Sequence, residues 1–210
     1  MRGLLFVACL TAWACGHHDE PKPKPSLSVD DDAREQARFD AERHPEKVVE
    51  ALGLHPGSRV ADVGAGSGLL TVHLARAVAP NGKVIATDID GAVLDLLAHR
   101  LEVAGLSDVV ERRVVAADAP ELEPNTYDAI LLAEVDHYFK DPVAWLTSAQ
   151  AALKPGGRIV ISNRIYHRVQ SMEAARKAGL VLASESTPVP THFIAVFVRP
   201  DAATHPGDHK

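Results

Sequence analysis

Cysteine, long apolar runs and an excess of basic residues are all missing from most of this sequence. Its two cysteines, Cys9 and Cys15, lie near the N-terminus, so the rest of the chain can form no internal disulfide. The apolar run in that region is too short to span a bilayer as a mature helix. The formal net charge of −6 argues against a general nucleic-acid-binding protein, which would normally be basic. With 210 residues, 46% of them hydrophobic, and no internal repeat, the chain has room for one domain with short tails.

The first 15 residues resemble a secretory signal. Arg2 precedes an apolar run that ends in small residues. The Ala14-Cys15 step resembles the lipobox of a bacterial lipoprotein, although Ala12 stands where leucine is usual. We therefore expect residues 1–15 to be a signal peptide, with lipidation at Cys15. Simple cleavage after Ala14 is the alternative, and so is a cytoplasmic protein translated from a later start codon.

The chain after residue 15 is expected to consist of three segments. Residues 16–30, which include a Pro/Lys-rich tract, are expected to form a flexible tether. Residues 31–199 are expected to form the globular domain with an N-terminal helical cap, and residues 200–210 a disordered tail. The protein is then exported and meets a membrane only through a lipid anchor at Cys15.

A glycine-rich turn follows the first expected strand. Gly64, Gly66 and Gly68 alternate with other residues, and a helical pattern begins directly after them. Glycine allows a tight turn and the close approach of a ligand, and a helix directs its free N–H groups at whatever the turn holds. The dinucleotide fingerprint needs a third glycine at position 69, which is Leu69. The pattern therefore predicts a small-molecule site and argues against a Rossmann oxidoreductase.

Strand and helix patterns alternate along the rest of the domain. Strands are expected at 59–63, 83–87, 109–115, 127–133, 157–162, 180–185 and 191–198, and helices at 31–53, 67–79, 91–104, 142–153 and 171–178. The first helical stretch is expected to break at His44-Pro45 and to end at Gly53. Alternation implies parallel strands with right-handed crossovers, whereas the short link between the last two strands requires an antiparallel pair. The expected fold is an α/β, Rossmann-like, doubly wound seven-stranded sheet, mostly parallel with an antiparallel final strand.

The segment from Val60 to Gly68 resembles motif I of the class I S-adenosylmethionine-dependent methyltransferases, and the type 11-like domain in particular. Further segments matching that family follow in order, and the resemblance covers about residues 45–199. It implies S-adenosylmethionine as the cofactor, which carries an ammonium and a sulfonium group. Asp62, just before the glycines, suits such a cation. A catalytic metal is not expected, because the strand at 157–162 ends in Ser162-Asn163 and Ala133 stands where a ligating acid would be needed.

The resemblance also implies which residues hold the cofactor. Asp88 matches the position that binds the ribose, and it lies about 20 residues past the turn, where an acid binds a ribose diol. Asp118 matches the acid that faces the adenine amino group; the alternative is a plain loop aspartate. Glu134 is expected to contact the cofactor; the alternative is that it makes no such contact. The expected cofactor-binding residues are Asp62, Gly64, Ala65, Gly66, Gly68, Asp88, Ile89, Asp118, Ala119 and Glu134.

The segment after the fourth strand is expected to line the site of methyl transfer. His137 is the candidate for a general base or an orienting residue, because its unperturbed pKa is about 6.5. The alternative is a histidine that only packs in the following loop. Asp136 and Tyr138 are candidates for contacts with the acceptor.

The favoured function is transfer of a methyl group from S-adenosylmethionine to an unidentified small molecule. The alternative is a non-catalytic ligand-binding lipoprotein on the same fold. An export signal favours that alternative, since the cofactor is made in the cytosol, whereas the intact glycine turn favours cofactor binding.

Overall fold

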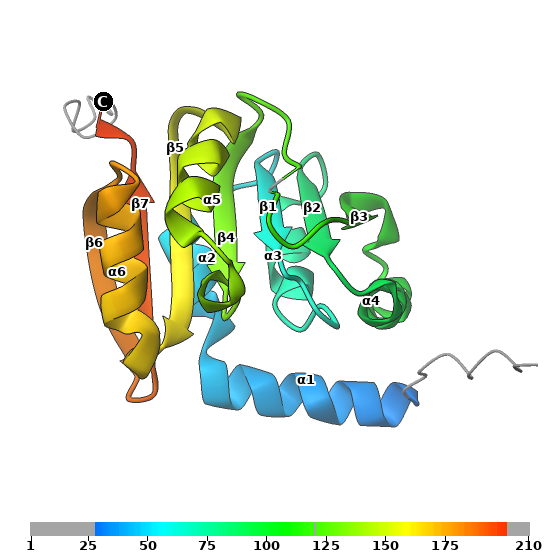
Figure 1. Cartoon of the computed structure of the whole chain (residues 1–210). Helices are drawn as coiled ribbons and strands as arrows, with labels where there is room; N and C mark the ends of the chain where they lie inside the picture. Colours follow the sequence, from blue (N-terminus) through cyan, green and yellow to red (C-terminus); the bar gives the residue numbers. More distant parts are fainter. Residues whose placement is uncertain (1–27, 120, 201–210) are drawn as a thin grey trace, which may run out of the picture.

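A seven-stranded mixed sheet forms the centre of the molecule (Figure 1). The computed structural model describes residues 28–119 and 121–200. The strands are β1 (Arg59–Val63), β2 (Lys83–Asp88), β3 (Val110–Val114), β4 (Tyr127–Ala133), β5 (Leu153–Arg164), β6 (Val181–Val189) and β7 (His192–Val198). Their order is β3-β2-β1-β4-β5-β7-β6. The pairs among β1 to β5 are parallel, and β7 runs antiparallel to both of its neighbours, so the predicted fold class is confirmed.

Helices cover both faces of this sheet. They are α1 (Val29–Arg43), α2 (Pro45–Leu52), α3 (Thr71–Val78), α4 (Gly91–Ala104), α5 (Pro142–Ala149) and α6 (Arg168–Lys177). Side chains of β4 alternate between two apolar cores: Ile130 and Leu132 pack with α5 and α6, while Ala129 and Leu131 pack with α2, α3 and α4. Burial on both faces explains why β4 is apolar without interruption from Ala129 to Ala133, as is usual for a parallel strand.

Some predicted boundaries were wrong. Helix α3 begins at Thr71, not at 67, because Gly68 has a φ of 86° and the chain is still turning there. Strand β5 begins at Leu153 rather than 157, since an irregularity in its pairing with β4 absorbs the Pro155-Gly156 turn. Strand β6 continues through Pro188, which an edge strand tolerates because no ladder needs its missing N–H.

The break at His44-Pro45 is confirmed. His44 has a left-handed backbone, with a φ of 50°, and Pro45 occupies the first turn of α2. Gly53 ends α2 with a φ of 63°. The predicted signal peptide, the lipid anchor at Cys15, most of the tether and nearly all of the tail lie outside the described residues and stay predictions. Within residues 28–119 and 121–200, no helix is both long and apolar enough to cross a membrane.

Helix α1 lies along the carboxyl edge of the sheet (Figure 1). Arg100 of α4 is buried and forms ion pairs with Asp32 at 2.6 Å and with Glu35 at 2.9 Å. His73 of α3 lies 2.8 Å from Asp40. The helix is therefore attached to the domain largely by charged and polar contacts.

Arg100→Met tests this attachment. The substitution leaves the buried Asp32 carboxylate without its cation, and removing one partner of a buried pair typically costs about 3–5 kcal/mol. We expect amide hydrogen exchange over residues 29–43 to accelerate markedly in this variant. Arg34→Met is the control, because its ion pair with Asp31 is largely exposed and worth less than about 1 kcal/mol. Equal protection of α1 in both variants would contradict the assigned role of Arg100.

Candidate functional site

Gly64 and Gly68 allow the turn after β1 to pack closely against two other elements. Their φ values are 71° and 86°, in the region that favours glycine. A Cβ at Gly64 would lie 2.7 Å from the side chain of Val135, and one at Gly68 would lie 2.1 Å from that of Leu97. Both glycines are therefore required by packing, with the segment after β4 and with α4 respectively.

Gly66 differs, because it borders open space next to Asp88. Its φ is 55°, and a Cβ placed there would meet no atom within 4 Å. Its N–H donates to Oδ2 of Asp88 at 2.9 Å, while Oδ1 accepts from the N–H of Asp90 at 3.0 Å. An ionised carboxylate accepts about four hydrogen bonds. Asp88 thus keeps capacity for a ligand hydroxyl, as the ribose-binding prediction requires.

A cavity of about 280 Å³ opens beside Asp88, at the carboxyl ends of β1 to β4. The walls include Ile89, Ala119, Phe139 and Trp145, so they are mostly apolar. This is where a doubly wound sheet binds ligands, since the strand order reverses between β1 and β4. Ligand cavities are typically apolar with a few well-placed polar groups.

Five of the ten predicted cofactor residues do not line this cavity: Asp62, Ala65, Gly66, Gly68 and Asp118. Asp62 is buried and accepts a hydrogen bond from Oγ1 of Thr71 at 2.7 Å, behind the turn and at the start of α3. Burial raises its pKa to about 6, although the bond from Thr71 opposes this shift. The carboxylate of Asp118 accepts from the N–H of Lys140 at 3.3 Å and borders a different hollow, next to α5. Ala65, between the glycines, packs against the apolar core of α3 and α4.

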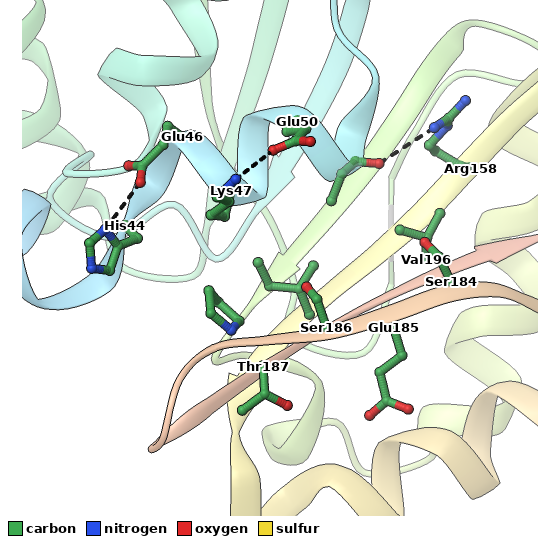
Figure 2. Close-up of a pocket in the computed structure, with 13 residues that line it drawn as sticks. His44, Glu46, Lys47, Glu50, Arg158, Ser184, Glu185, Ser186, Thr187 and Val196 are labelled. Atoms are coloured by element: carbon green, nitrogen blue, oxygen red, sulfur yellow. Dashed lines mark hydrogen bonds and ion pairs between the residues drawn. The ribbon is translucent and has the colours of Figure 1, made fainter.

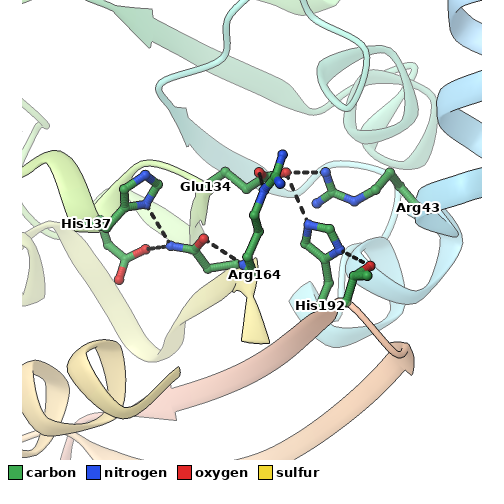
Figure 3. A network of polar contacts seen from close by, with 8 residues as sticks. Arg43, Glu134, His137, Arg164 and His192 are labelled. Atoms are coloured by element: carbon green, nitrogen blue, oxygen red, sulfur yellow. Dashed lines mark hydrogen bonds and ion pairs between the residues drawn. The ribbon is translucent and has the colours of Figure 1, made fainter. Parts of the chain in front are cut away.

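Glu134 does line the cavity, and it is surrounded by positive charge (Figure 3). It forms ion pairs with Arg43 and with Arg164 at 3.0 Å, and Nε2 of His192 lies 3.5 Å from it. Burial alone would raise the pKa of Glu134, but the hydrogen bond from Arg164 and the charge of Arg43 bring it below its ordinary value. Its φ of 53° is unusual for a residue other than glycine and is typical of functional sites. A carboxylate held by two arginines therefore lines the cavity.

His137 lies in a short 3-10 turn after β4 and does not itself line the cavity. Its ring stacks on His167 at 4.0 Å with an angle of 14° between the planes, and its Nδ1 is 3.0 Å from Nδ2 of Asn163. Burial lowers the pKa of His137, and the charge of His167 adds to this effect. Both effects favour the neutral form of the ring.

Four rings form a continuous aromatic surface at this edge, which we call the ring ladder: Tyr138, His137, His167 and Tyr166. Adjacent ring centroids are 4.0 to 4.4 Å apart. The two tyrosines at its ends are 77% and 70% exposed, and Tyr138 also lines the cavity. The ladder thus extends from the cavity to the surface.

A larger hollow lies elsewhere, between α2 and the hairpin of β6 and β7 (Figure 2). It measures about 750 Å³. The charged groups on its α2 wall already have partners: Lys47 pairs with Glu50 at 3.0 Å, and His44 with Glu46 at 3.0 Å. Neither a glycine turn nor the switch of strand order adjoins it, so the cavity at Asp88 is the candidate site. Among residues 28–119 and 121–200, no group of three or more His, Cys, Asp or Glu residues is arranged to hold a metal ion.

Sequence and structure comparisons find methyltransferases. A family model described as a methyltransferase domain matches residues 61–159. The ubiquinone/menaquinone biosynthesis C-methyltransferase UbiE of Idiomarina loihiensis is 31% identical over 169 residues, which cover 75% of this chain and 66% of that protein. A ubiquinone biosynthesis O-methyltransferase of Xanthomonas campestris is 32% identical over 146 residues, covering 69% of this chain and 58% of that protein. The chain therefore spans two thirds or less of the length of these relatives.

Among solved structures, a SAM dependent methyltransferase from Aquifex aeolicus superposes with a TM-score of 0.70 at 22% identity. The match covers 82% of this chain and 98% of that one. The chain belongs to the class I S-adenosylmethionine-dependent methyltransferase family. The predicted family and its cofactor are thereby confirmed.

The cavity of this methyltransferase fits the nucleoside part of that cofactor. Gly66 borders open space and donates its N–H to Asp88. Asp88 offers free lone pairs for a ribose diol. Thr87 lines the cavity, and its buried hydroxyl has no hydrogen-bond partner among the described residues. These groups are fixed before any ligand arrives, since Thr87 also accepts the N–H groups of Gly64 and Ala65 on its backbone oxygen at 2.8 and 2.9 Å.

Asp88→Asn is expected to weaken binding of S-adenosylmethionine to this methyltransferase by about 10- to 100-fold. The amide keeps one oxygen for Gly66 but removes the charge, and a hydrogen bond to a charged group is worth about 1.5–3 kcal/mol. Calorimetric titration measures the change. Asp90→Asn is the matched control: it removes the same charge two residues away, and asparagine caps α4 equally well. Equal losses in both variants would rule out a direct contact of Asp88 with the cofactor.

Asp62→Asn is expected to change how stability depends on pH. An acid whose pKa is raised to about 6 by folding stabilises the folded state fully below its ordinary value of 3.8, and loses that contribution as the pH rises through 6. The neutral amide shows no such loss. The free energy of unfolding of the variant should therefore rise relative to wild type between pH 4.5 and 7.5, by about 2 kcal/mol. Urea unfolding at several pH values measures it; a difference independent of pH would contradict the raised pKa.

Proposed function

We propose that this protein transfers a methyl group from S-adenosylmethionine to a small planar aromatic acceptor of the phenol or quinol type. The observation that carries the proposal is the ring ladder, which joins the cofactor cavity to the surface at the end of β4. An aromatic ring binds well to such a surface, because stacked or tilted ring pairs add about 0.5–1.5 kcal/mol to the gain from burial. The names of the relatives, which refer to ubiquinone and menaquinone biosynthesis, support the same class of acceptor.

When bound, the cofactor supplies a methyl group that is already electrophilic because it sits on a sulfonium. The protein then has to place the acceptor and keep water out, and positioning of this kind accounts for much of the rate. Phe139 and Trp145, whose rings stack at 4.5 Å, form a rigid apolar wall of the cavity. Glu134 offers carboxylate oxygens to the ammonium group of the cofactor, and Arg43 and Arg164 hold that carboxylate in place.

The alternative, a non-catalytic protein that binds a ligand on the same fold, differs in one respect that can be measured. It binds S-adenosylmethionine or another ligand in the cavity without turning it over. The intact Gly66–Asp88 contact and the open ring ladder favour catalysis.

The test uses the full-length chain and cofactor labelled in its methyl group. Titrations with S-adenosylmethionine and, separately, with NAD are followed by transfer assays with 1,4-dihydroxynaphthalene and with its saturated analogue decahydronaphthalene-1,4-diol. We expect binding of S-adenosylmethionine only, and transfer of label to the planar compound only. Cofactor binding without transfer to either compound would favour the non-catalytic alternative, and binding of NAD alone would reject the proposal.

We also propose that the protein acts outside the cytoplasm, attached to a membrane through a lipid on Cys15. The support is the sequence of residues 1–15, with Arg2, the apolar run and the Ala14-Cys15 step. Such an anchor would hold the catalytic domain close to a lipid phase, where apolar aromatic compounds accumulate. A source of cofactor in that compartment is then required.

A further inference from the structure

A buried amide lies within hydrogen-bond distance of His137. Asn163, near the end of β5, is fully buried. Its Nδ2 donates to Oδ1 of Asp136 at 2.6 Å and lies 3.0 Å from Nδ1 of His137. Its Oδ1 accepts the backbone N–H of Arg164 at 2.7 Å. All polar atoms of this amide are therefore engaged at short range.

The orientation of the amide follows from the chemistry of its partners. An ionised carboxylate only accepts hydrogen bonds, so the NH₂ group of Asn163 must face Asp136. A backbone N–H only donates, so the oxygen must face Arg164. Rotating the amide by 180° would place oxygen against the carboxylate and NH₂ against N–H, and would break both bonds. The second oxygen of Asp136 accepts from the hydroxyl of Ser171, which is also buried and holds the carboxylate in place.

This orientation decides which nitrogen of His137 carries the proton. A ring nitrogen that faces an N–H donor has to present its lone pair. Nδ1 of His137 faces Nδ2 of Asn163, so a proton on Nδ1 would set two donors against each other at 3.0 Å. The same conflict disfavours the doubly protonated ring. Only the neutral form with its proton on Nε2 satisfies every contact.

We infer that Asn163 is a positioning residue that fixes His137 in the neutral form protonated on Nε2, so that His137 serves the acceptor as a hydrogen-bond donor and not as a general base. Only the donor role of His137 toward the acceptor rests on the proposed function. The tautomer itself follows from contacts of the protein alone. A donor next to the ring ladder favours an acceptor oxygen that carries negative charge or a lone pair, such as that of a phenolate.

The charged and titratable groups around His137 agree with this assignment. His167 stacks on its face, Arg164 and Glu134 lie at the adjacent strand ends, and Asp136 precedes it in the same turn. His167 and Arg164 act against protonation of His137, whereas Asp136 and Glu134 favour it. Burial also disfavours the protonated ring and is the largest of these effects, so the pKa of His137 falls below its ordinary value.

Nuclear magnetic resonance of the full-length protein labelled with ¹⁵N-histidine tests the tautomer directly. The two nitrogens of a neutral imidazole have well-separated shifts, and coupling to the ring protons tells them apart. The signals of His137 are identified by their loss in His137→Gln. We expect Nε2 to carry the proton at pH 7 in wild type, with and without S-adenosylhomocysteine. A protonated Nδ1, or rapid exchange between the two forms, overturns the inference whatever the activity of the protein.

Two variants separate the role of Asn163 from general stability. Asn163→Asp places an acceptor against Nδ1, so the proton should move to Nδ1 and the pH at which His137 titrates should rise. Ser171→Ala is the matched control, because it removes a bond to the same Asp136 without changing the partner of Nδ1, and it should leave the tautomer as in wild type. If Asn163→Asp does not fold, the wild-type measurement still decides. A wild-type tautomer in a folded Asn163→Asp protein would overturn the inference.

The donor role is tested by methyl transfer to 1,4-dihydroxynaphthalene. Gln offers an amide N–H near the position of Nε2 but cannot act as a base at neutral pH. We expect His137→Gln to keep the rate within about threefold of wild type, with an unchanged pH profile, and His137→Leu to lose about tenfold or more, as for a lost charge-assisted bond. Equal losses in both variants would assign His137 as a base. Cofactor titrations on the same samples show separately whether the proposed function itself has failed.

Discussion

The arrangement of the site depends on the close approach between the turn after β1 and the segment after β4. Gly64 has no side chain, and Val135 occupies the space that a Cβ there would need, 2.7 Å from its nearest atom. Val135 stands between Glu134 and the turn that holds His137, so this single contact sets the position of both. The N–H groups of Gly64 and Ala65 bond to β2 at the same point. Three neighbouring strand ends are thus fixed relative to one another before a ligand binds, which is the preorganisation that catalysis by positioning requires.

The pKa values of two acids in this framework, Asp62 and Glu134, shift in opposite directions because their partners differ. Asp62 has a single hydroxyl partner and no cation nearby, so burial dominates and its pKa rises to about 6. Glu134 is partly buried as well, but two arginines oppose the effect of burial and its pKa falls. The first acid therefore supports the start of α3, while the second keeps its charge where the cofactor cation is expected. The type of residue alone does not reveal this division of roles.

The sequence predicted what depends on local signals. The glycine turn, the acid at the end of β2, the break at His44-Pro45 and the alternation of strands and helices all follow from a few neighbouring residues, and the structure contains each of them. The predicted start of α3 was wrong because the glycines that mark the turn also make the turn longer, so the helix begins only at Thr71. The partners of Glu134 come from α1, β5 and β7, which meet only when β7 pairs with β5 in one register. Asn163 was considered only as a departure from a metal-binding pattern, since its contact with His137 depends on the pairing of β4 with β5.

Helix α1 joins these parts into one unit. It crosses the carboxyl edge of the sheet, and its two ends are held differently. Near the start of α1, the buried Arg100 of α4 forms ion pairs with two acids of the helix. At the end of α1, Arg43 pairs with Glu134, and its guanidinium lies 5.7 Å from the centre of the Phe39 ring. Any ligand that competes for Glu134 therefore changes a contact that also holds α1. Because these contacts are ionic, they weaken with salt more than the two apolar cores do. The covering helix is thus the part of the domain whose attachment is linked most directly to the charge in the site.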